Sequence, residues 1–180
     1  MADQFDYVIV GAGTAGCVLA NRLTACGTYS VCLLEAGPPD WNLMIHIPAG
    51  FIKTLVNPSV NWMYQSEVSE GTNGRTIPMP RGKVLGGSSS INGLIFNRGQ
   101  KMDFDVWAQK GNRGWSYDDV LPYFRRYENH ENSADASYRG QNGEMTITNL
   151  AWRDPLCEAF IDGAESIGIP RNPDYNGAYQ

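Results

Sequence analysis

The chain has 180 residues, of which 42% are hydrophobic and 18% charged, a composition that excludes an intrinsically disordered protein. Its net charge of −5 argues against a general nucleic-acid-binding protein, and no apolar run approaches the roughly 20 residues of a transmembrane helix. The four cysteines form no Cys-x-x-Cys pair and the two histidines lie far apart, so we expect reduced thiols and no metal site. Since no secretory signal precedes the first apolar run, we expect a cytoplasmic protein and leave peripheral membrane association open.

Residues 5–37 predict a nucleotide-binding βαβ unit. An apolar run ends in Gly11-x-Gly13-x-x-Gly16, an amphipathic stretch follows, and residues 30–34 predict a buried parallel strand. The three glycines permit a sharp turn, close approach of a pyrophosphate to the backbone, and tight packing of the helix on the strand. Glu35 follows Gly16 by 19 residues, about the spacing of a carboxylate that binds ribose hydroxyls. The unit therefore predicts a site for an ADP group.

The next part of the chain, up to residue 80, carries weaker signals. Residues 41–60 mix apolar residues with Gly and Pro and predict a loop with one helical turn, in which His46 is packed. Residues 62–68 and 75–80 predict two strands joined through a turn at Asn73-Gly74.

A second glycine cluster lies in the segment 81–99. Its Gly-Gly-Ser-Ser-Ser run, residues 86–90, leaves room for a planar ring and presents oriented N–H groups, with Arg81 and Lys83 adding positive charge nearby. A dinucleotide has two ends and needs a second contact region, so we predict that this segment binds the same cofactor as the first glycine loop. Arg98 is assigned either to the cofactor wall or to a surface ion pair.

The remainder of the chain predicts short elements. Residues 103–109 predict a helix, and Ser116 is predicted to cap a second helix with Asp119 at its third position. Residues 128–142 are polar and predict a mobile surface loop in which His130 is solvated. Residues 145–148 predict a strand, and residues 155–167 a helix that stops at Gly168.

Only two strong candidates for parallel strands are present, fewer than a complete nucleotide-binding sheet contains. We therefore predict an α/β, Rossmann-like domain that is incomplete in this chain, with inserted loops, and expect the chain to be part of a larger protein.

Together these residues resemble the glucose–methanol–choline (GMC) oxidoreductases, a family of FAD-dependent enzymes with an α+β fold overall. The resemblance rests on the first glycine motif with residues 35–37 and on the signature run at residues 82–92, and continues through Asp105-x-Trp107, Gly114-Trp115 and residues 120–124. Within the family it is strongest to bacterial choline-dehydrogenase-like alcohol dehydrogenases. It implies that residues 1–180 form the N-terminal part of such an enzyme. Residues 5–37 would then be the ADP-binding unit, 81–99 the second FAD-binding stretch, and about 100–180 the start of the lid and part of the substrate domain.

The resemblance also implies the cofactor and its contacts. FAD would be held without a covalent link, because Ile91 stands where choline oxidases carry the attaching histidine. The residues that would hold FAD are Gly11, Gly13, Thr14, Ala15, Gly16, Glu35, Ala36, Arg81, Val84, Leu85, Gly86, Gly87, Ser88, Ser89, Asn92, Gly93, Leu94 and Ile95. The family's catalytic histidine and its partner lie near the C-terminus of a much longer chain, so no catalytic residue is predicted here. Trp62, Trp107 and Trp115 are assigned to packing rather than to shielding of the flavin.

The implied reaction is oxidation of an alcohol to an aldehyde or ketone by hydride transfer to flavin N5, with the chain alone inactive. The implied partners are a small-molecule alcohol and the missing C-terminal portion, in the same polypeptide or as a separate chain. Four alternatives stay open: an oxygen-using alcohol oxidase, a photodecarboxylase, a hydroxynitrile lyase, and a non-catalytic FAD-binding fragment. The sequence names neither the alcohol, the electron acceptor nor the oligomeric state.

Overall fold

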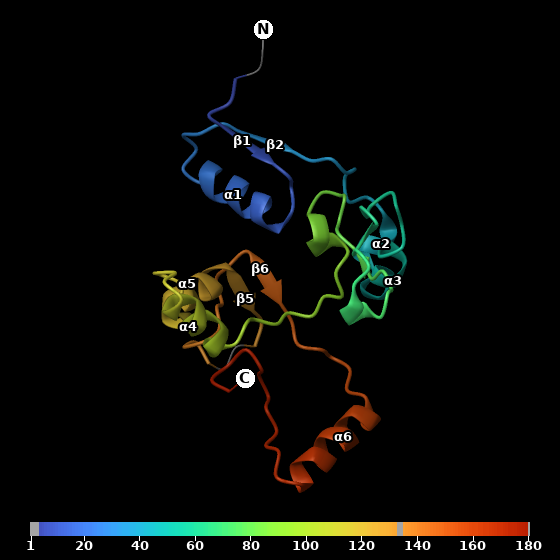
Figure 1. Cartoon of the computed structure of the whole chain (residues 1–180). Coiled ribbons are helices and arrows are strands. Elements are labelled where there is room, and N and C mark those ends of the chain that lie inside the picture. Colours follow the sequence, from blue (N-terminus) through green and yellow to red (C-terminus); the bar gives the residue numbers. More distant parts are fainter. Residues whose placement is uncertain (1–3, 133–134, 180) are drawn as a thin grey trace. The chain divides into compact units, whose positions relative to one another are not determined.

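A computed structural model describes residues 4–132 and 135–179 (Figure 1). The chain divides into two compact units, an N-terminal unit that ends at Ile95 and a C-terminal unit that starts at Phe96. Each unit is described by itself.

The N-terminal unit begins with the predicted βαβ motif. Strand β1 (Tyr7–Val10) and strand β2 (Val31–Leu34) pair in parallel, and helix α1 (Thr14–Thr24) connects them (Figure 1). The predicted parallel strands are confirmed, but the predicted burial of the second strand is wrong, because every residue of β2 keeps part of its surface exposed. The physical reason is that β1 and β2 form a two-stranded sheet by themselves within the described residues, so their faces have few neighbours.

Residues 41–60 contain more helix than predicted. In place of one helical turn there are three short segments, α2 (Leu43–His46), η1 (Pro48–Gly50) and α3 (Phe51–Thr54). The Asn42 side chain accepts a hydrogen bond from the Met44 N–H and so starts α2. Ile45 and Leu55 then pack against the buried cluster of Val60, Val84 and Ile91, which is the core of this unit.

His46 does not have the packed position predicted for it. Its side chain ends α2 with 55% of its surface exposed, and its Nε2 lies 2.6 Å from the carbonyl oxygen of Asp40. Its apolar neighbours do not cover the ring, because Ile45 packs against the core cluster and Ile47 is itself 40% exposed.

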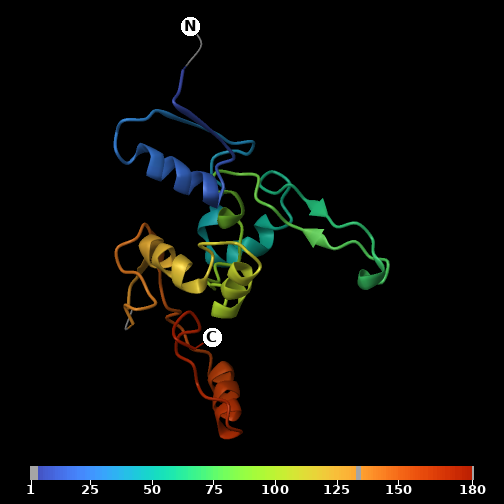
Figure 2. The ribbon, with the colours of Figure 1, turned by 60° about the vertical axis from the view of Figure 1, so that its left-hand side comes forward.

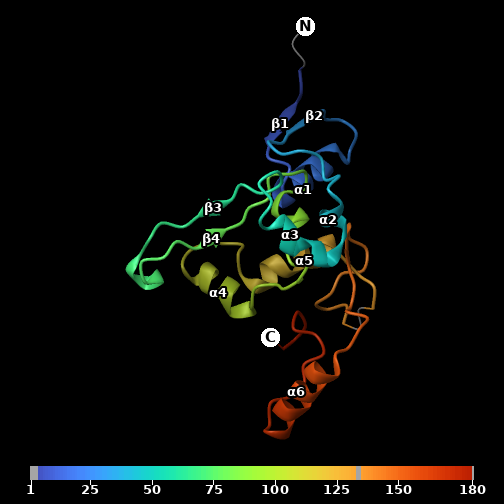
Figure 3. The same ribbon diagram turned by 90° about the vertical axis from the view of Figure 1, so that its right-hand side faces the viewer.

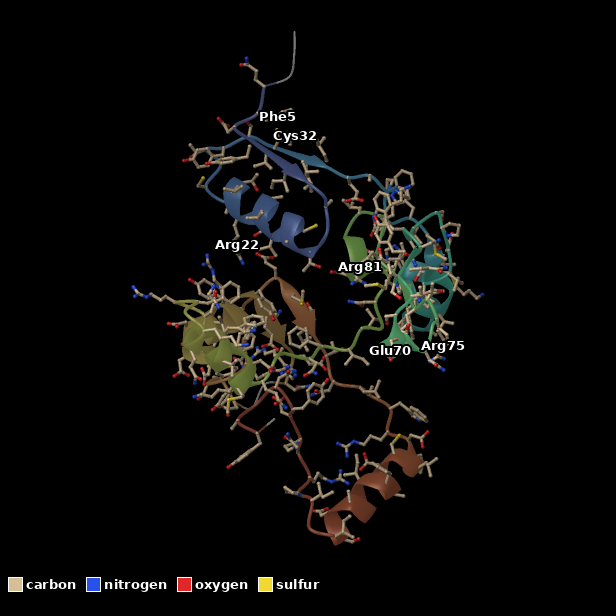
Figure 4. The ribbon with its side chains drawn as sticks, viewed as in Figure 1. Phe5, Arg22, Cys32, Glu70, Arg75 and Arg81 are labelled. Carbon is tan, nitrogen blue, oxygen red and sulfur yellow. The ribbon has the colours of Figure 1, made fainter. Side chains whose placement is uncertain are left out.

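The predicted hairpin is confirmed but its strands are shorter. Strands β3 (Tyr64–Gln65) and β4 (Pro78–Met79) pair antiparallel, and the connecting loop contains the 3₁₀ turn η2 (Glu70–Thr72), with Glu70 and Arg75 at its tip (Figures 2 and 4). Asn73 and Gly74 take left-handed conformations with φ of 54° and 71°, as the predicted turn requires. The pairing is short because Pro78 and Pro80 have no N–H to donate.

The C-terminal unit contains the remaining predicted elements. Helices α4 (Lys101–Gln109) and α5 (Tyr117–Tyr127) pack together (Figure 3), and Ser116 caps α5 by accepting from the Asp119 N–H, as predicted. Strands β5 (Glu128–His130) and β6 (Met145–Ile147) pair in parallel, and α6 (Pro155–Ser166) ends before Gly168, whose φ is 93°. None of the described helices combines the length and the apolar character that a membrane span needs.

The prediction of a surface loop at residues 128–142 holds for the exposed residues 131–132, 135–137 and 141–142, but it is wrong for the buried residues 128, 130, 139 and 140, and residues 133–134 lie outside the described residues. Glu128 is fully buried and pairs with Arg98 through Oε2 and with Arg139 through Oε1, the latter at 2.8 Å. Arg139 also contacts Asp174 at 3.2 Å. Arg98, assigned earlier to the cofactor wall or a surface pair, therefore belongs to a buried ion cluster. A charged side chain considered alone is expected to lie in solvent. In this cluster two arginines and two carboxylates neutralise one another, so their side chains can be buried.

His130 is also buried rather than solvated. It is 9% exposed, its backbone N–H donates to Gly140 O at 2.8 Å, and its Nδ1 accepts from the Asn132 N–H at 3.2 Å. The β5 pairing therefore carries this side chain inward with Glu128.

Aromatic rings contact both arginines of the ion cluster, with Phe124 5.2 Å from the Arg98 guanidinium and Phe96 5.8 Å from that of Arg139. Trp107 and Trp115 contact each other edge to face at 5.7 Å and keep about half of their surface exposed, and Phe104 and Phe124 continue the contacts at 5.5 Å. Burial in this cluster raises the pKa of the Tyr127 phenol above its ordinary value.

Candidate cofactor site

The first glycine loop joins the end of β1 to the start of α1. Gly11 has a φ of 96°, which only glycine adopts without strain. A Cβ on Gly16 would lie 1.9 Å from the carbonyl oxygen of Gly11, so helix and loop can approach this closely only at a glycine. The first turn of α1 contains no acidic residue, and the N-cap Gly13 has no side chain that could accept a hydrogen bond from the free N–H groups. These N–H groups and the positive end of the helix dipole are therefore available to a ligand. This is the geometry that binds a phosphate.

Glu35 ties the end of β2 to that loop. Its Oε2 accepts from the Ala12 N–H at 2.7 Å and its Oε1 accepts from the Gly37 N–H at 2.9 Å. Each carboxylate oxygen has a second lone pair, so the side chain can hold the loop and still accept hydrogen bonds from ribose hydroxyls.

The second glycine cluster lies directly on the first. The Gly86 N–H donates to Ala12 O at 2.7 Å, and the hydroxyl groups of Thr14 and Ser89 form a hydrogen bond. A Cβ on Gly87 would lie 2.7 Å from the Cα of Gly13. Two segments more than 70 residues apart in the sequence are thus in backbone contact, as expected of two loops that share one ligand.

A cleft of about 900 Å³ opens beside these loops. The predicted site residues that line it are Gly11, Gly13, Thr14, Ala15, Gly16, Glu35, Ala36, Arg81, Gly87 and Ser88. Figure 4 shows Arg81 beside the second glycine loop. The first glycine loop, the end of β2 and the second glycine loop therefore face one space.

Other predicted site residues do not line the cleft. Val84 is fully buried in the core beside Ile91, and Leu85 donates its N–H to Pro38 O at 3.0 Å. The Asn92 side chain accepts from the Leu94 N–H at 3.0 Å, and Leu94 and Ile95 are exposed. The remaining ones outside the lining are Gly86, Ser89 and Gly93.

Trp62, which was predicted to serve packing rather than to shield the flavin, and Tyr64, which was predicted only as a strand residue, both line the cleft. Their rings stack at 5.9 Å with an interplanar angle of 3°, and both face the cleft, as does Gly82. Met63 between them has a φ of 57°, so the alternation of an extended strand does not account for their shared orientation, and the sequence carries no local signal for it.

These features fit a dinucleotide whose two phosphates lie at the N-terminus of α1. The glycine positions leave no Cβ in the cradle, and the charged groups of Glu35 and Arg81 suit a ribose and a phosphate respectively. Fold and site thus define a dinucleotide-binding protein with a partial Rossmann-like domain.

Comparison with known proteins identifies the family within this class of dinucleotide-binding proteins. Residues 5–180 match the family model described as GMC oxidoreductase, and the chain belongs to this family. It is 44% identical to an oxygen-dependent choline dehydrogenase from Vibrio vulnificus, over all of this chain and 32% of that protein. It is 41% identical to an alcohol dehydrogenase [acceptor] from Pseudomonas putida, over 98% of this chain and 32% of that protein. The chain therefore spans about a third of the length of the curated relatives it matches.

Solved structures agree with the family. Pyridoxine 4-oxidase from Mesorbium loti matches with a TM-score of 0.88 and 35% identity, over 96% of this chain and 34% of that one. Formate oxidase from Aspergillus oryzae, solved in work on its FAD modification, matches with a TM-score of 0.82 and 32% identity, over 92% of this chain and 31% of that one. The predicted family and fold class are confirmed, and the family supports FAD as the dinucleotide.

Proposed function

We propose that this chain forms the FAD-binding part of an enzyme that oxidises the CH–OH group of an alcohol to a carbonyl. The observation that carries the proposal is the cradle of two glycine loops joined at Gly86 N–H to Ala12 O, with the Glu35 carboxylate at its edge. FAD, when bound, supplies the acceptor for the hydride that leaves the alcohol carbon. The relatives named as choline dehydrogenase and alcohol dehydrogenase support this reaction class.

The residues of this chain bind and orient the cofactor. The N–H groups at the start of α1 would hold the pyrophosphate and Glu35 the adenosine ribose, while Ser88 and the backbone around Gly87 would face the flavin end. We assign residues 5–37 to the ADP-binding unit, 81–99 to the second FAD-binding stretch, and about 100–180 to the start of lid and substrate-domain elements. The groups that remove the hydroxyl proton would come from the part that the longer relatives have beyond this match.

The first experiment is spectroscopic. The protein expressed from its complete gene should purify with bound flavin, and anaerobic addition of a reactive alcohol should bleach the flavin's visible absorption. Glu35→Ala should weaken FAD binding about tenfold or more, since it removes two charge-assisted hydrogen bonds and the ribose acceptor. A protein that binds no flavin, or whose flavin no alcohol in a broad screen reduces, would refute the proposal.

An oxygen-using alcohol oxidase is the second candidate. The specific observation in its favour is that both structural neighbours described above are named oxidases. Stoichiometric hydrogen peroxide during alcohol turnover in air would identify an oxidase, whereas turnover that requires an added dye would identify a dehydrogenase.

We further propose that FAD is held non-covalently. Ile91 has no nucleophilic atom, and its side chain is 2% exposed and packs with Val60 and Val84 in the core rather than along the cleft. Acid precipitation of the holoenzyme should leave all flavin in the supernatant, and flavin that stays with the precipitate would contradict this.

A cytoplasmic location is proposed on the cysteines. Cys17, Cys26, Cys32 and Cys157 all carry free thiols, as is usual in a reducing compartment. Cell fractionation would test this, and recovery of the protein from the periplasm or an organelle lumen would contradict it.

A further inference from the structure

The buried side chain of Asn61 lies behind the wall of the cofactor cleft. It is 2% exposed, and three backbone groups from separate segments surround its amide. Its Nδ2 donates to Leu55 O at 2.6 Å, while its Oδ1 accepts from Met63 N–H at 2.9 Å and from Arg81 N–H at 3.0 Å. Because one partner is a carbonyl and two are N–H groups, only one orientation of the amide satisfies them all.

One of these partners has an unusual backbone. Met63 has a φ of 57°, in the left-handed region, which costs a side chain with a Cβ roughly 1 kcal/mol or more. The Met63 N–H donates to Asn61 Oδ1 at 2.9 Å, a hydrogen bond that favours this conformation. Met63 itself is 44% exposed, so core packing does not impose its φ.

The left-handed residue sits between the two rings that line the cleft. Trp62 and Tyr64 stack on either side of it, and the Lys83 ammonium lies 4.8 Å from the centre of the Trp62 ring. The Trp62 N–H donates to Arg81 O at 2.9 Å, so the aromatic pair and Arg81 belong to one hydrogen-bonded ladder. Trp62, Tyr64 and Arg81 all line the cleft, whereas Asn61 does not.

We propose that Asn61 is a positioning residue for FAD. It holds Met63 in its left-handed conformation and fixes the Arg81 backbone, and in this way orients the Trp62–Tyr64 stack and Arg81 toward the cofactor. This rests on the proposed function. Asn61 touches neither cofactor nor substrate, and acts through the two segments that it joins.

The test compares the FAD dissociation constants of apoprotein variants made in the protein expressed from its complete gene. Asn61→Leu, which keeps the size but removes all three hydrogen bonds, should raise the constant about tenfold or more. Asn57→Leu is the matched control, since Asn57 caps only the local turn at Ser59 and should leave FAD binding within about twofold. Near-UV circular dichroism of the Trp62–Tyr64 stack should change in the first variant and not in the control.

FAD binding by variants of Met63 tests the proposed role directly, because it would not change if Asn61 only stabilised the fold. Met63→Val should weaken FAD binding although the residue is exposed, because a β-branched side chain disfavours positive φ. Met63→Gly should bind FAD as the parent does, and adding it to Asn61→Leu should recover at least half of the lost affinity on a logarithmic scale, because glycine adopts this φ without help.

The outcomes separate the two proposals. A parent protein that binds no FAD refutes the proposed function. A parent that binds FAD while Asn61→Leu and Met63→Val bind it within twofold of the parent overturns the role of Asn61, as does a double variant with Met63→Gly that recovers nothing. If Asn61→Leu does not fold, Met63→Val against Met63→Gly decides.

Discussion

The buried ion cluster of the C-terminal unit supports a quantitative prediction for Glu128→Gln. The substitution keeps the shape of the side chain and removes the one charge that faces both Arg98 and Arg139. The side chains of the three residues are 0–3% exposed, so water cannot replace the lost carboxylate. Arg139 keeps its contact with Asp174 at 3.2 Å, whereas Arg98 loses its anionic partner and keeps the Tyr138 carbonyl and the face of the Phe124 ring.

The expected cost follows from leaving buried charges unpaired. Removing one member of a buried ion pair destabilises a protein by about 3–5 kcal/mol. At about 2 kcal/mol per M of urea, this lowers the unfolding midpoint by about 1.5–2.5 M. Because buried pairs are poorly screened, the loss should persist at high salt.

Urea unfolding followed by tryptophan fluorescence measures this loss, since Trp107 and Trp115 lie in the same unit. Glu131→Gln is the matched control: it makes the same chemical change three residues along, at an exposed carboxylate that accepts from the Asn149 N–H at 2.8 Å, and should cost about 1 kcal/mol or less. A loss below about 1 kcal/mol for Glu128→Gln would refute the reasoning, because it would mean that the guanidinium groups reach water or another anion.

Two further perturbations test other parts of the fold. Gly16→Ala should abolish FAD binding and destabilise the N-terminal unit, because its Cβ would meet a backbone oxygen at 1.9 Å, whereas Gly163→Ala in α6 meets nothing within 4 Å and should stabilise by about 0.5–1 kcal/mol. Normal flavin content in Gly16→Ala would show that the helix can shift away from the loop. For Asp6, hydrogen bonds from the Ser30 N–H and hydroxyl lower its pKa below the ordinary 3.8, so its stabilising effect is present above that pH and is lost as the pH falls through the lowered value. Asp6→Asn should therefore lower the melting temperature at neutral pH and match the parent well below pH 3.8, and a difference that grows in acid would contradict this sign.

The features predicted correctly from the sequence are those whose signals are local. The glycine spacing, α1 and the strand before Glu35 lie in one contiguous stretch, and the cap at Ser116 needs only the carboxylate three residues on. In each case the residues that determine the structure are also the residues that adopt it. The contact between the two glycine loops is predicted on different grounds: a dinucleotide has two ends and needs a second contact region. This argument uses the chemistry of the ligand rather than the spacing of residues.

The features that sequence reasoning missed are those that distant segments create together. Glu128, Arg98 and Asp174 come from three separate parts of the chain, and a charged side chain read alone indicates solvent. Trp62 and Tyr64 read as strand residues of a hairpin, and only the fold of the Arg81 segment beside them places them on the cleft. Neither arrangement leaves a periodic or motif signal.

The cofactor cradle lies within the N-terminal unit, so its residues are synthesised before those of the C-terminal unit. Every contact between the glycine loop, Glu35 and the second glycine cluster joins residues before Ile95. At synthesis rates of about 5–20 residues per second, this much of the chain is complete within about 5–20 s. The segments of the cradle are thus synthesised before the rest of the chain, so the order of synthesis allows them to meet FAD while the ribosome is still adding later residues.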